Sequence, residues 1–448
     1  MMKRYKTRGR PVLARLGAGV ALLAAVGASG CNLDLTNPNS PPEEVVLTSS
    51  EGIIALAEGM QAQYAGTGVG TGMVLNMVRA PALVTDEWST RTAALAADRS
   101  LATGQGVDPS YGVVTSPYYT AFRVTRSAND LLANVSKVGL AQGTQVGITA
   151  LAKTFKAMAL GSIAQQYERI PVDASLEGSP LRPRAEVMDT AIALLESARA
   201  DLGSVTTAQL AEFRSRVQGS SFDLGNTVNA MLARFYLFRG QYQKAIDAAD
   251  RVNLGVLSAF TYPDPNRNPI WGYSVSVLYV AGLNTFVTEA EPGDRRPAYW
   301  LRTDLATFNG NPTLPLRSFR TYQDKNESFP VYLPDEMRLI KAEALVRLGG
   351  AANFAQALTL INQVRTQTSS TLNEPVAGLP AKTAAELGTQ DALLRQIAYE
   401  RRYELYMQGV RWEDLRRFGP AIAGKTPKVA FLPLPQSECL YNPARVCG

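Results

Sequence analysis

Histidine is absent from all 448 residues of this chain. Its absence excludes Ser-His-Asp and Cys-His catalysis, the zinc motifs built on histidine, and any mechanism that needs a histidine general base. Long apolar runs are also missing after the first thirty residues, where no uncharged stretch reaches the length of a membrane span. A hydrophobic content of 46% and a charged content of 19% are otherwise typical of a globular protein.

Positive charge is concentrated in the leader. Residues 1–30 hold six Lys and Arg but no Asp or Glu, and an apolar run over residues 16–26 precedes the sequence Ala-Ser-Gly-Cys that ends at Cys31. This order predicts a lipoprotein signal peptide over residues 1–30, with lipid attached to Cys31; an ordinary secretory signal before an accidental cysteine is the alternative. Without the leader, 39 Lys and Arg face 39 Asp and Glu. A mature net charge near zero argues against nucleic-acid binding, so membrane attachment would come from the lipid.

Two cysteines remain for the folded part of the chain. Cys439 and Cys447 lie eight residues apart in a tail that contains Pro and Asn. In an exported protein this pair is expected to form a disulfide that closes a small loop, and two free thiols are the alternative. Two thiolates without histidine leave a zinc ion short of ligands, so we expect no metal site and no cofactor. Residues 31–46, rich in Asn and Pro, are predicted to be a tether between lipid and domain.

Helical periodicity dominates residues 47–448. Two segments share one internal spacing, and each follows an amphipathic helix and a glycine turn: Tyr242, Ala245, Ala249 and Val252 in the first, and Phe354, Ala357, Ile361 and Val364 in the second. Small residues at this spacing let two helices approach, which is typical of tetratricopeptide repeats, although unrelated hairpins can share it. The sequence therefore predicts a mainly α fold, a tetratricopeptide-like superhelix with repeats at roughly residues 116–254 and 334–419. Ser116 and Pro117 have the residue types of a helix start.

A loop-rich segment interrupts the helices at roughly residues 255–333. Its only strand-like patch is Tyr273–Val280, where Ser and Val alternate. Aromatic faces bind the C–H surfaces of sugars and fixed polar groups bind their hydroxyls, so we predict that this insertion holds the ligand site. The candidate ligand-binding residues are Trp271, Tyr273, Arg296, Tyr299 and Trp300. For each aromatic alone, the alternative is a residue that anchors the loop on the scaffold.

Clustered carboxylates are the features that could suggest catalysis. Glu400 and Glu404 lie one helical turn apart in a helix dense in Glu and Arg, and Asp86-Glu87-Trp88 joins two carboxylates to an aromatic ring. Two converging carboxylates could hydrolyse a glycosidic bond. Ion pairs with neighbouring helices explain Glu400 and Glu404 better, so no catalytic residue is predicted. The cluster Asp86-Glu87-Trp88 could sit in a sugar site, but a capped helix start explains it better.

The C-terminal part of the chain carries a longer pattern. Residues 397–419 read IAYERRYELYMQGVRWEDLRRFG, residues 333–344 read LPDEMRLIKAEA, and residues 431–438 read FLPLPQSE. These segments resemble the SusD/RagB family, outer-membrane lipoproteins that capture nutrients for a TonB-dependent porin. Two positions depart from the family signature: Val410 stands where the family often has His, and Gln408 where it has Glu.

The resemblance implies one SusD-like domain over residues 47–448, with its ligand segment at 255–333. It implies a non-enzymatic protein, lipid-anchored in the outer membrane and facing the cell surface, that binds an oligosaccharide and delivers it to a SusC-like TonB-dependent porin. The alternatives are peptide capture within the same family, a repeat scaffold that binds no small ligand, and a glycosidase without histidine. The signature residues Arg411, Trp412 and Asp414 are expected to pack and to form ion pairs.

Overall fold

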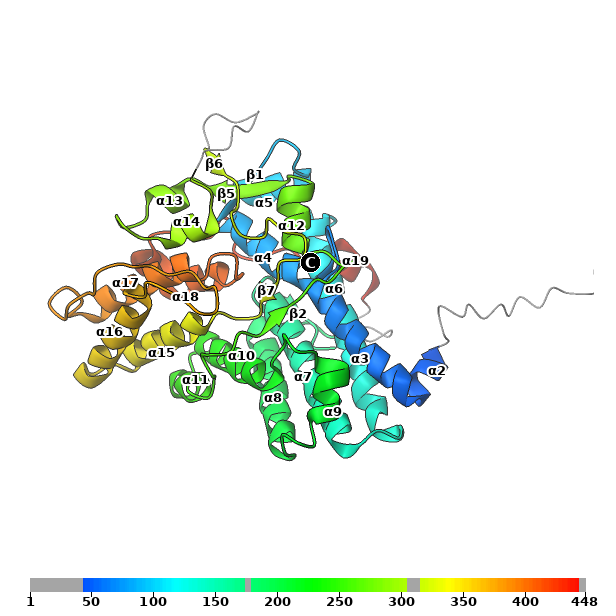
Figure 1. Cartoon of the computed structure of the whole chain (residues 1–448). Helices are drawn as coiled ribbons and strands as arrows, with labels where there is room; N and C mark the ends of the chain where they lie inside the picture. Colours follow the sequence, from blue (N-terminus) through cyan, green and yellow to red (C-terminus); the bar gives the residue numbers. More distant parts are fainter. Residues whose placement is uncertain (1–42, 174–178, 304–314, 443–448) are drawn as a thin grey trace, which may run out of the picture. The chain divides into compact units, whose positions relative to one another are not determined.

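The structure, a computed structural model (Figure 1), describes residues 43–173, 179–303 and 315–442. The chain divides into two compact units, residues 1–46 and 47–448. The second unit consists mainly of helices, which confirms the prediction of a mainly α fold. Cys31 and Cys447 lie outside the described residues, whereas Cys439 is described and is disulfide-bonded.

Helices account for most of the ordered elements. The α-helices are α2 (Glu43–Thr48), α3 (Ser50–Ala65), α4 (Gly72–Val84), α5 (Ala96–Thr103), α6 (Gly112–Asn134), α7 (Gln142–Ala164), α8 (Arg184–Gly203), α9 (Ala211–Phe213), α10 (Leu224–Phe238), α11 (Tyr242–Ala249), α12 (Pro269–Trp271), α13 (Thr285–Thr288), α14 (Arg296–Trp300), α15 (Pro334–Leu348), α16 (Ala351–Arg365), α17 (Gln390–Glu404), α18 (Arg411–Ala423) and α19 (Gln436–Tyr441). Tighter or wider turns are the 3₁₀ helix η1 (Val135–Lys137) and the π-helical turns η2 (Arg214–Gln218) and η3 (Gly272–Ser276). The strands are β1 (Trp88–Thr90), β2 (Arg169–Ile170), β3 (Arg182–Pro183), β4 (Ala259–Phe260), β5 (Val280–Leu283), β6 (Leu316–Arg317) and β7 (Phe329–Pro330).

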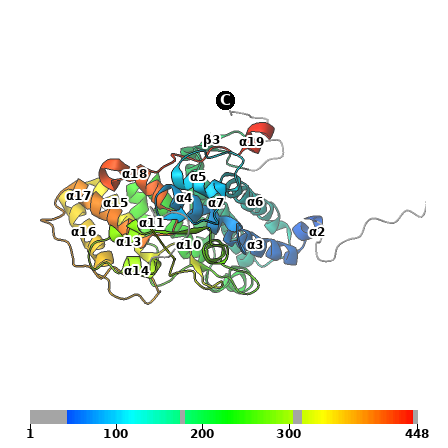
Figure 2. The same ribbon diagram turned by 90° about the horizontal axis from the view of Figure 1, so that it is seen from above.

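The two predicted helical hairpins are present. Helices α10 and α11 turn at Gly240, and α15 and α16 turn at Gly349 and Gly350; all three glycines have positive φ. Ala245 and Ala357 are fully buried, as the small-residue spacing predicted. Helix α11 packs against α15, so the hairpins are neighbours, and α17 packs against both α15 and α16. Figure 2 shows α15, α16 and α17 at the opposite end of the unit from α3 and α6.

One helix of the described chain, α7, is long and apolar enough to cross a membrane. Most of its residues are buried, and it packs against α3, α6 and α8. Its apolar composition is therefore that of a helix in the core of the domain.

The predicted start of α6 is wrong by one turn. The helix begins at Gly112, and Pro117 lies inside it. The earlier start buries Val113 and Val114, whose apolar surfaces leave water. The side chain of Ser116 caps no backbone amide; its hydroxyl instead accepts a hydrogen bond of 3.2 Å from Nδ2 of Asn76.

The predicted strand over Tyr273–Val280 is also largely wrong. Residues 272–276 form η3, which continues α12, and β5 begins only at Val280. The side chain of Asn268 accepts from the backbone N–H of Ile270 (2.8 Å) and so caps this helical turn. The hydroxyl of Ser274 donates to the carbonyl of Ile270 (2.8 Å), so this polar residue of the alternating pattern is satisfied within the turn.

Short strand pairings hold the loop-rich insertion in place. At its base, β4 pairs antiparallel with β7, so Phe260 lies opposite Phe329. Further along, β5 is the central strand of an antiparallel sheet with the order β1-β5-β6. Gly282 in β5 lies opposite Trp88, and a Cβ atom there would lie 2.5 Å from the side chain of Leu301. A side chain at position 282 would therefore require Leu301 and Tyr406 to shift.

Candidate functional site

The C-terminal signature joins α17 to α18 and is packed into the core. Trp412 is fully buried, and its Nε1 donates to the carbonyl of Val429 (3.0 Å). Asp414 accepts from Nε and Nη2 of Arg401, both at 2.9 Å, and lies 3.0 Å from Nη1 of Arg417. Burial alone would raise the pKa of Asp414, but the two guanidinium groups outweigh it and lower the pKa below its usual range. These contacts confirm that Trp412 and Asp414 are structural residues.

The turn between these helices fits only glycine at one position. Gly409 has φ 72°, and a Cβ atom there would lie 2.1 Å from the carbonyl oxygen of Met77 in α4. Positive φ and close approach to another backbone are the two conditions that glycine alone meets. Gly409 thus fixes the signature against the N-terminal helices.

The carboxylates of α17 face a buried arginine. Nη1 of Arg296 lies 2.7 Å from Oε2 of Glu400 and 3.4 Å from Oε2 of Glu404, and its Nη2 lies 2.8 Å from Asp294. All four side chains are fully buried. Burial raises the pKa of Glu404 well above its usual range. These carboxylates therefore face a guanidinium group inside the core, as the ion-pair interpretation predicted.

The segment Asp86-Glu87-Trp88 does not start a helix, contrary to the prediction. It follows the end of α4 and enters β1, and Asp86 has φ 62°. Trp88 is buried, with its ring 5.2 Å from that of Phe319. Glu87 is also buried, and burial raises its pKa to about 8. The cluster therefore presents no aromatic face to solvent.

Three of the five predicted ligand residues lie in the interior. The ring of Trp300 is buried, and its Nε1 donates to the carbonyl of Tyr403 (2.9 Å). Tyr273 is buried and donates its hydroxyl to Asp98. Arg296 is the core arginine that pairs with α17. The structure thus corrects the predicted role of these three residues: they anchor the insertion, because their binding faces are already covered by protein.

The other two predicted residues keep part of their surface. Trp271 is half-buried at the end of α12, with the guanidinium carbon of Arg267 5.8 Å from its ring centroid. Tyr299 is half-buried in α14 and donates its hydroxyl to the carbonyl of Asn373 (2.6 Å). They lie on separate short helices, so the structure does not gather the five candidates into one aromatic surface.

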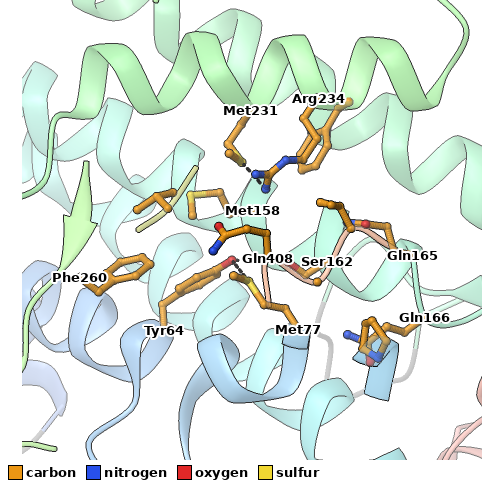
Figure 3. A pocket seen from close by; sticks show the side chains of 15 residues that line it. Tyr64, Met77, Met158, Ser162, Gln165, Gln166, Met231, Arg234, Phe260 and Gln408 are labelled. Carbon is orange, nitrogen blue, oxygen red and sulfur yellow. Dashed lines mark hydrogen bonds between the residues drawn. The ribbon is translucent and has the colours of Figure 1, made fainter. Parts of the chain in front are cut away.

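Three hollows in the described chain differ in size and lining. An interior cavity of about 20 Å³ lies beside Gln408 (Figure 3) and is far smaller than a ligand site, which takes roughly 300–1,000 Å³. A groove of about 630 Å³ runs along α11, α15 and α16 and has no aromatic residue in its lining. An open hollow of about 370 Å³ lies on the insertion. Its lining residues are Ala298, Leu301, Arg302, Thr303, Arg320 and Gln323.

The insertion hollow is built where two segments of the insertion meet. Leu301 forms a β-bridge with Phe319, and the backbone N–H of Arg320 donates to the carbonyl of Trp300 (2.8 Å). Nη1 of Arg320 donates to the carbonyl of Ala298 (2.9 Å), which fixes the guanidinium at the edge of the hollow. The lining thus offers guanidinium, amide and hydroxyl donors for ligand oxygens. Among its described residues it has no Asp or Glu, the pair that a glycosidase uses.

Sequence reasoning proposed the insertion as the ligand segment and did not select the residues that line this hollow. Arg302, Arg320 and Gln323 follow no periodic pattern, and they carry none of the aromatic rings on which the prediction relied. Two of the predicted residues, Tyr299 and Trp300, lie between the lining residues Ala298 and Leu301 in sequence. The structural signal is the bridge between Leu301 and Phe319, which the sequence does not reveal.

Glu374 has a buried carboxyl group and follows Asn373, whose carbonyl accepts the hydroxyl of Tyr299. Glu374 is buried, and Ser370 donates to its Oε2 (3.3 Å). Burial and, next, the Asp335 carboxylate raise the pKa of Glu374 to about 7. The charged or titratable groups around it are Asp335, Arg338, Tyr299, Tyr332 and Glu404.

We therefore expect the free energy of unfolding to fall as the pH rises through the raised pKa of Glu374. Its reference pKa of 4.5 lies below its folded pKa, so its protonation stabilises the fold below about pH 4.5, and this contribution is lost as the pH rises towards 7. Glu374→Gln should remove the loss, with a gain of about 2–3 kcal/mol at pH 8 and almost none at pH 4.5. Urea unfolding at both pH values measures the difference, and an equal effect at both would contradict the assignment.

Known proteins resemble this chain in sequence over one region and in fold over most of its length. Residues 317–441 match the model of the SusD family. A SusD superfamily protein from Bacteroides vulgatus has a TM-score of 0.67 at 17% identity, over 88% of this chain and 99% of that one. A SusD-like carbohydrate binding protein from Bacteroides fragilis has a TM-score of 0.65 at 12% identity, over 90% and 100%. No curated protein matches the chain in sequence.

At these identities the solved structures establish a shared fold, and the sequence match adds the region that contains the signature. That region covers α15 to α19, including the turn at Gly409 and the buried pair of Arg401 and Asp414. The resemblance seen in the sequence is thereby confirmed over residues 317–441, which match the SusD family, within a fold shared with SusD superfamily proteins.

Proposed function

We propose that this chain is a lipid-anchored outer-membrane protein that binds an oligosaccharide at the insertion hollow and delivers it to a TonB-dependent transporter. The observation that carries the proposal is the open hollow of about 370 Å³, whose size suits a small sugar segment. Arg320 and Gln323 at its edge offer several hydrogen-bond donors, which is what sugar hydroxyls require. Several solved relatives are described as carbohydrate or sugar binding proteins, which supports the same ligand class.

The membrane part of the proposal rests on the leader. Basic residues, an apolar run and small residues precede Cys31 in the order of a lipoprotein signal. The Cys31→Ala chain should therefore leave the membrane fraction, and if it stays there the anchor is not Cys31. Co-purification of the lipidated chain with a TonB-dependent transporter from outer membranes tests the partner.

Peptide capture is the second candidate function, and the groove along α11, α15 and α16 favours it. The groove is larger, about 630 Å³, and combines an apolar floor that includes Val252 and Met337 with polar groups such as Lys341 and Gln363. Such a mixture suits an extended peptide better than a sugar, because no aromatic face is available for stacking.

Binding measurements separate these functions. Soluble protein without residues 1–31 is screened against glycans and peptides, and the best ligand is titrated by calorimetry. For a glycan, Arg320→Gln and Gln323→Ala should each weaken binding by about 1–3 kcal/mol, because they remove donors from the hollow. Arg267→Gln changes an exposed arginine of the same insertion outside the hollow and should leave affinity unchanged.

Different outcomes identify the site. If only peptides bind, and Gln363→Ala weakens them while Arg320→Gln does not, the groove is the binding site. If a glycan binds equally well to all hollow variants but poorly to Trp271→Ala, the site lies at α12. A protein that binds no glycan or peptide contradicts nutrient capture and favours the scaffold alternative.

A further inference from the structure

The interior cavity beside the signature turn has an unusual lining for the core of a domain. Figure 3 shows three methionines, Met77, Met158 and Met231, around it, together with the ring of Tyr64. Polar side chains from three separate segments line the same space: Ser162, Gln165 and Gln166 from the end of α7 and the turn after it, Arg234 from α10, and Gln408 from the turn after α17. An apolar cavity stays dry, but one with this lining has groups that need partners.

Gln408 is the lining residue with the greatest need for a hydrogen-bond partner. Only 2% of its surface reaches solvent, and among the described residues neither its Oε1 nor its Nε2 has a hydrogen-bond partner. In Figure 3 its amide lies in the middle of the lining, between Met158 and Tyr64. A buried amide with no partner on either side is strongly disfavoured, so a molecule that both donates and accepts is required at this position.

Two further glutamines, Gln165 and Gln166, line the cavity. Nε2 of Gln165 donates to the carbonyl of Gly161 (3.1 Å), and Nε2 of Gln166 donates to the carbonyl of Asn76 (3.1 Å). These bonds fix the orientation of both amides. Each Oε1 is buried and has no partner among the described residues. The site therefore combines fixed acceptors from the α7 side with an amide from the signature turn.

Arg234 determines which charge the cavity tolerates. Its Nε and Nη2 pair with the carboxylate of Glu336 at 2.6 and 2.5 Å, so the charge is balanced. Among the described residues, its Nη1 has the sulfur of Met231, at 3.6 Å, as its one hydrogen-bond partner. The guanidinium group of Arg234 would repel a cation in the cavity, and the amide oxygens of three glutamines would repel an anion. A neutral molecule is the one that the lining favours.

We propose that this cavity is a built water site, in which water joins Gln408 of the signature turn to Gln165 and Gln166. The volume of about 20 Å³ accommodates about one or two water molecules and excludes a larger ligand. Water donates two hydrogen bonds and accepts two, which matches a lining of amide oxygens with the donors of Gln408 and Arg234. The bridge connects the C-terminal signature with the α7 end of the N-terminal helices.

The experiment removes the side-chain amide of Gln408 and keeps the approximate length of the side chain. Gln408→Met retains an unbranched side chain of similar length, and Met158→Leu changes an apolar residue of the same lining as the control. Oxygen-17 relaxation dispersion on the mature protein reports long-lived buried water. We expect Gln408→Met to lose about one or two such waters relative to the parent, with a melting temperature lower by about 2 °C or more, whereas Met158→Leu retains the water.

The opposite results overturn the proposal. In a dry cavity the unpaired amide only destabilises the fold, so Gln408→Met would raise the melting temperature. A variant that retains all of the parent's buried water also overturns the proposal, whatever its melting temperature. If Gln408→Met does not fold, a high-resolution crystal structure of the parent decides. Water density within hydrogen-bond distance of the Gln408 amide supports the site, and a dry cavity excludes it.

Discussion

Replacing Arg296 with methionine should lower the free energy of unfolding by about 3–5 kcal/mol, because it leaves buried carboxylates without their cation. Arg296 is fully buried and faces Asp294, Glu400 and Glu404, with its closest contact at 2.7 Å to Glu400. Urea unfolding measures the loss. A methionine fills much of the arginine's volume, so the effect reports the missing charge more than a missing volume.

The adjacent arginine provides the control. Arg295 is exposed, and its Nη2 donates to the carbonyl of Thr368 at 3.1 Å. Arg295→Met should cost about 1 kcal/mol or less, because no buried carboxylate depends on it. If Arg296→Met instead keeps full stability and loses only ligand binding, Arg296 is a ligand residue and its structural assignment here is wrong.

Trp412→Ala should have an effect of similar size, about 3–5 kcal/mol, since it empties a fully buried indole site. It also leaves the carbonyl of Val429 without the N–H that it accepts at 3.0 Å. The matched comparison is Trp271→Ala, because Trp271 is only half-buried and should contribute clearly less to stability. Thermal and urea unfolding of both variants test the difference, and equal losses would contradict the distinction between the two tryptophans.

The helical hairpins could be predicted because their signal is local. The spacing of Ala245 and Ala357 reports how closely two sequence neighbours can approach, and both residues are fully buried as expected. The signature could be predicted for a similar reason, since Arg401 and Asp414 pair across a single turn between adjacent helices. Element boundaries were less accurate, because Val113 and Val114 extend α6 beyond its apparent start to gain burial.

The side chains that stay exposed on the insertion could not be selected from the sequence, because their exposure depends on distant segments. Trp300 is covered at Tyr403, Tyr273 hydrogen-bonds to Asp98, and Arg296 meets α17. From residue type alone, these three side chains were predicted to bind sugars. The sequence contains no indication of their partners in the core. The same limit applies to the hollow itself, because it exists only where residues 298–303 meet residues 319–323.

The pairing of β4 with β7 has a consequence for how this protein can diversify. Because Phe260 and Phe329 lie opposite each other, the chain leaves the helical scaffold and returns to it at one place. The intervening segment can therefore change in length and composition without shifting the register of α10, α11, α15 or α16. Four contacts limit this change: Arg296 and Trp300 contact α17, Tyr273 hydrogen-bonds to Asp98, and β5 pairs with β1. Between these fixed points the exposed side chains can change, while the scaffold that presents them stays the same.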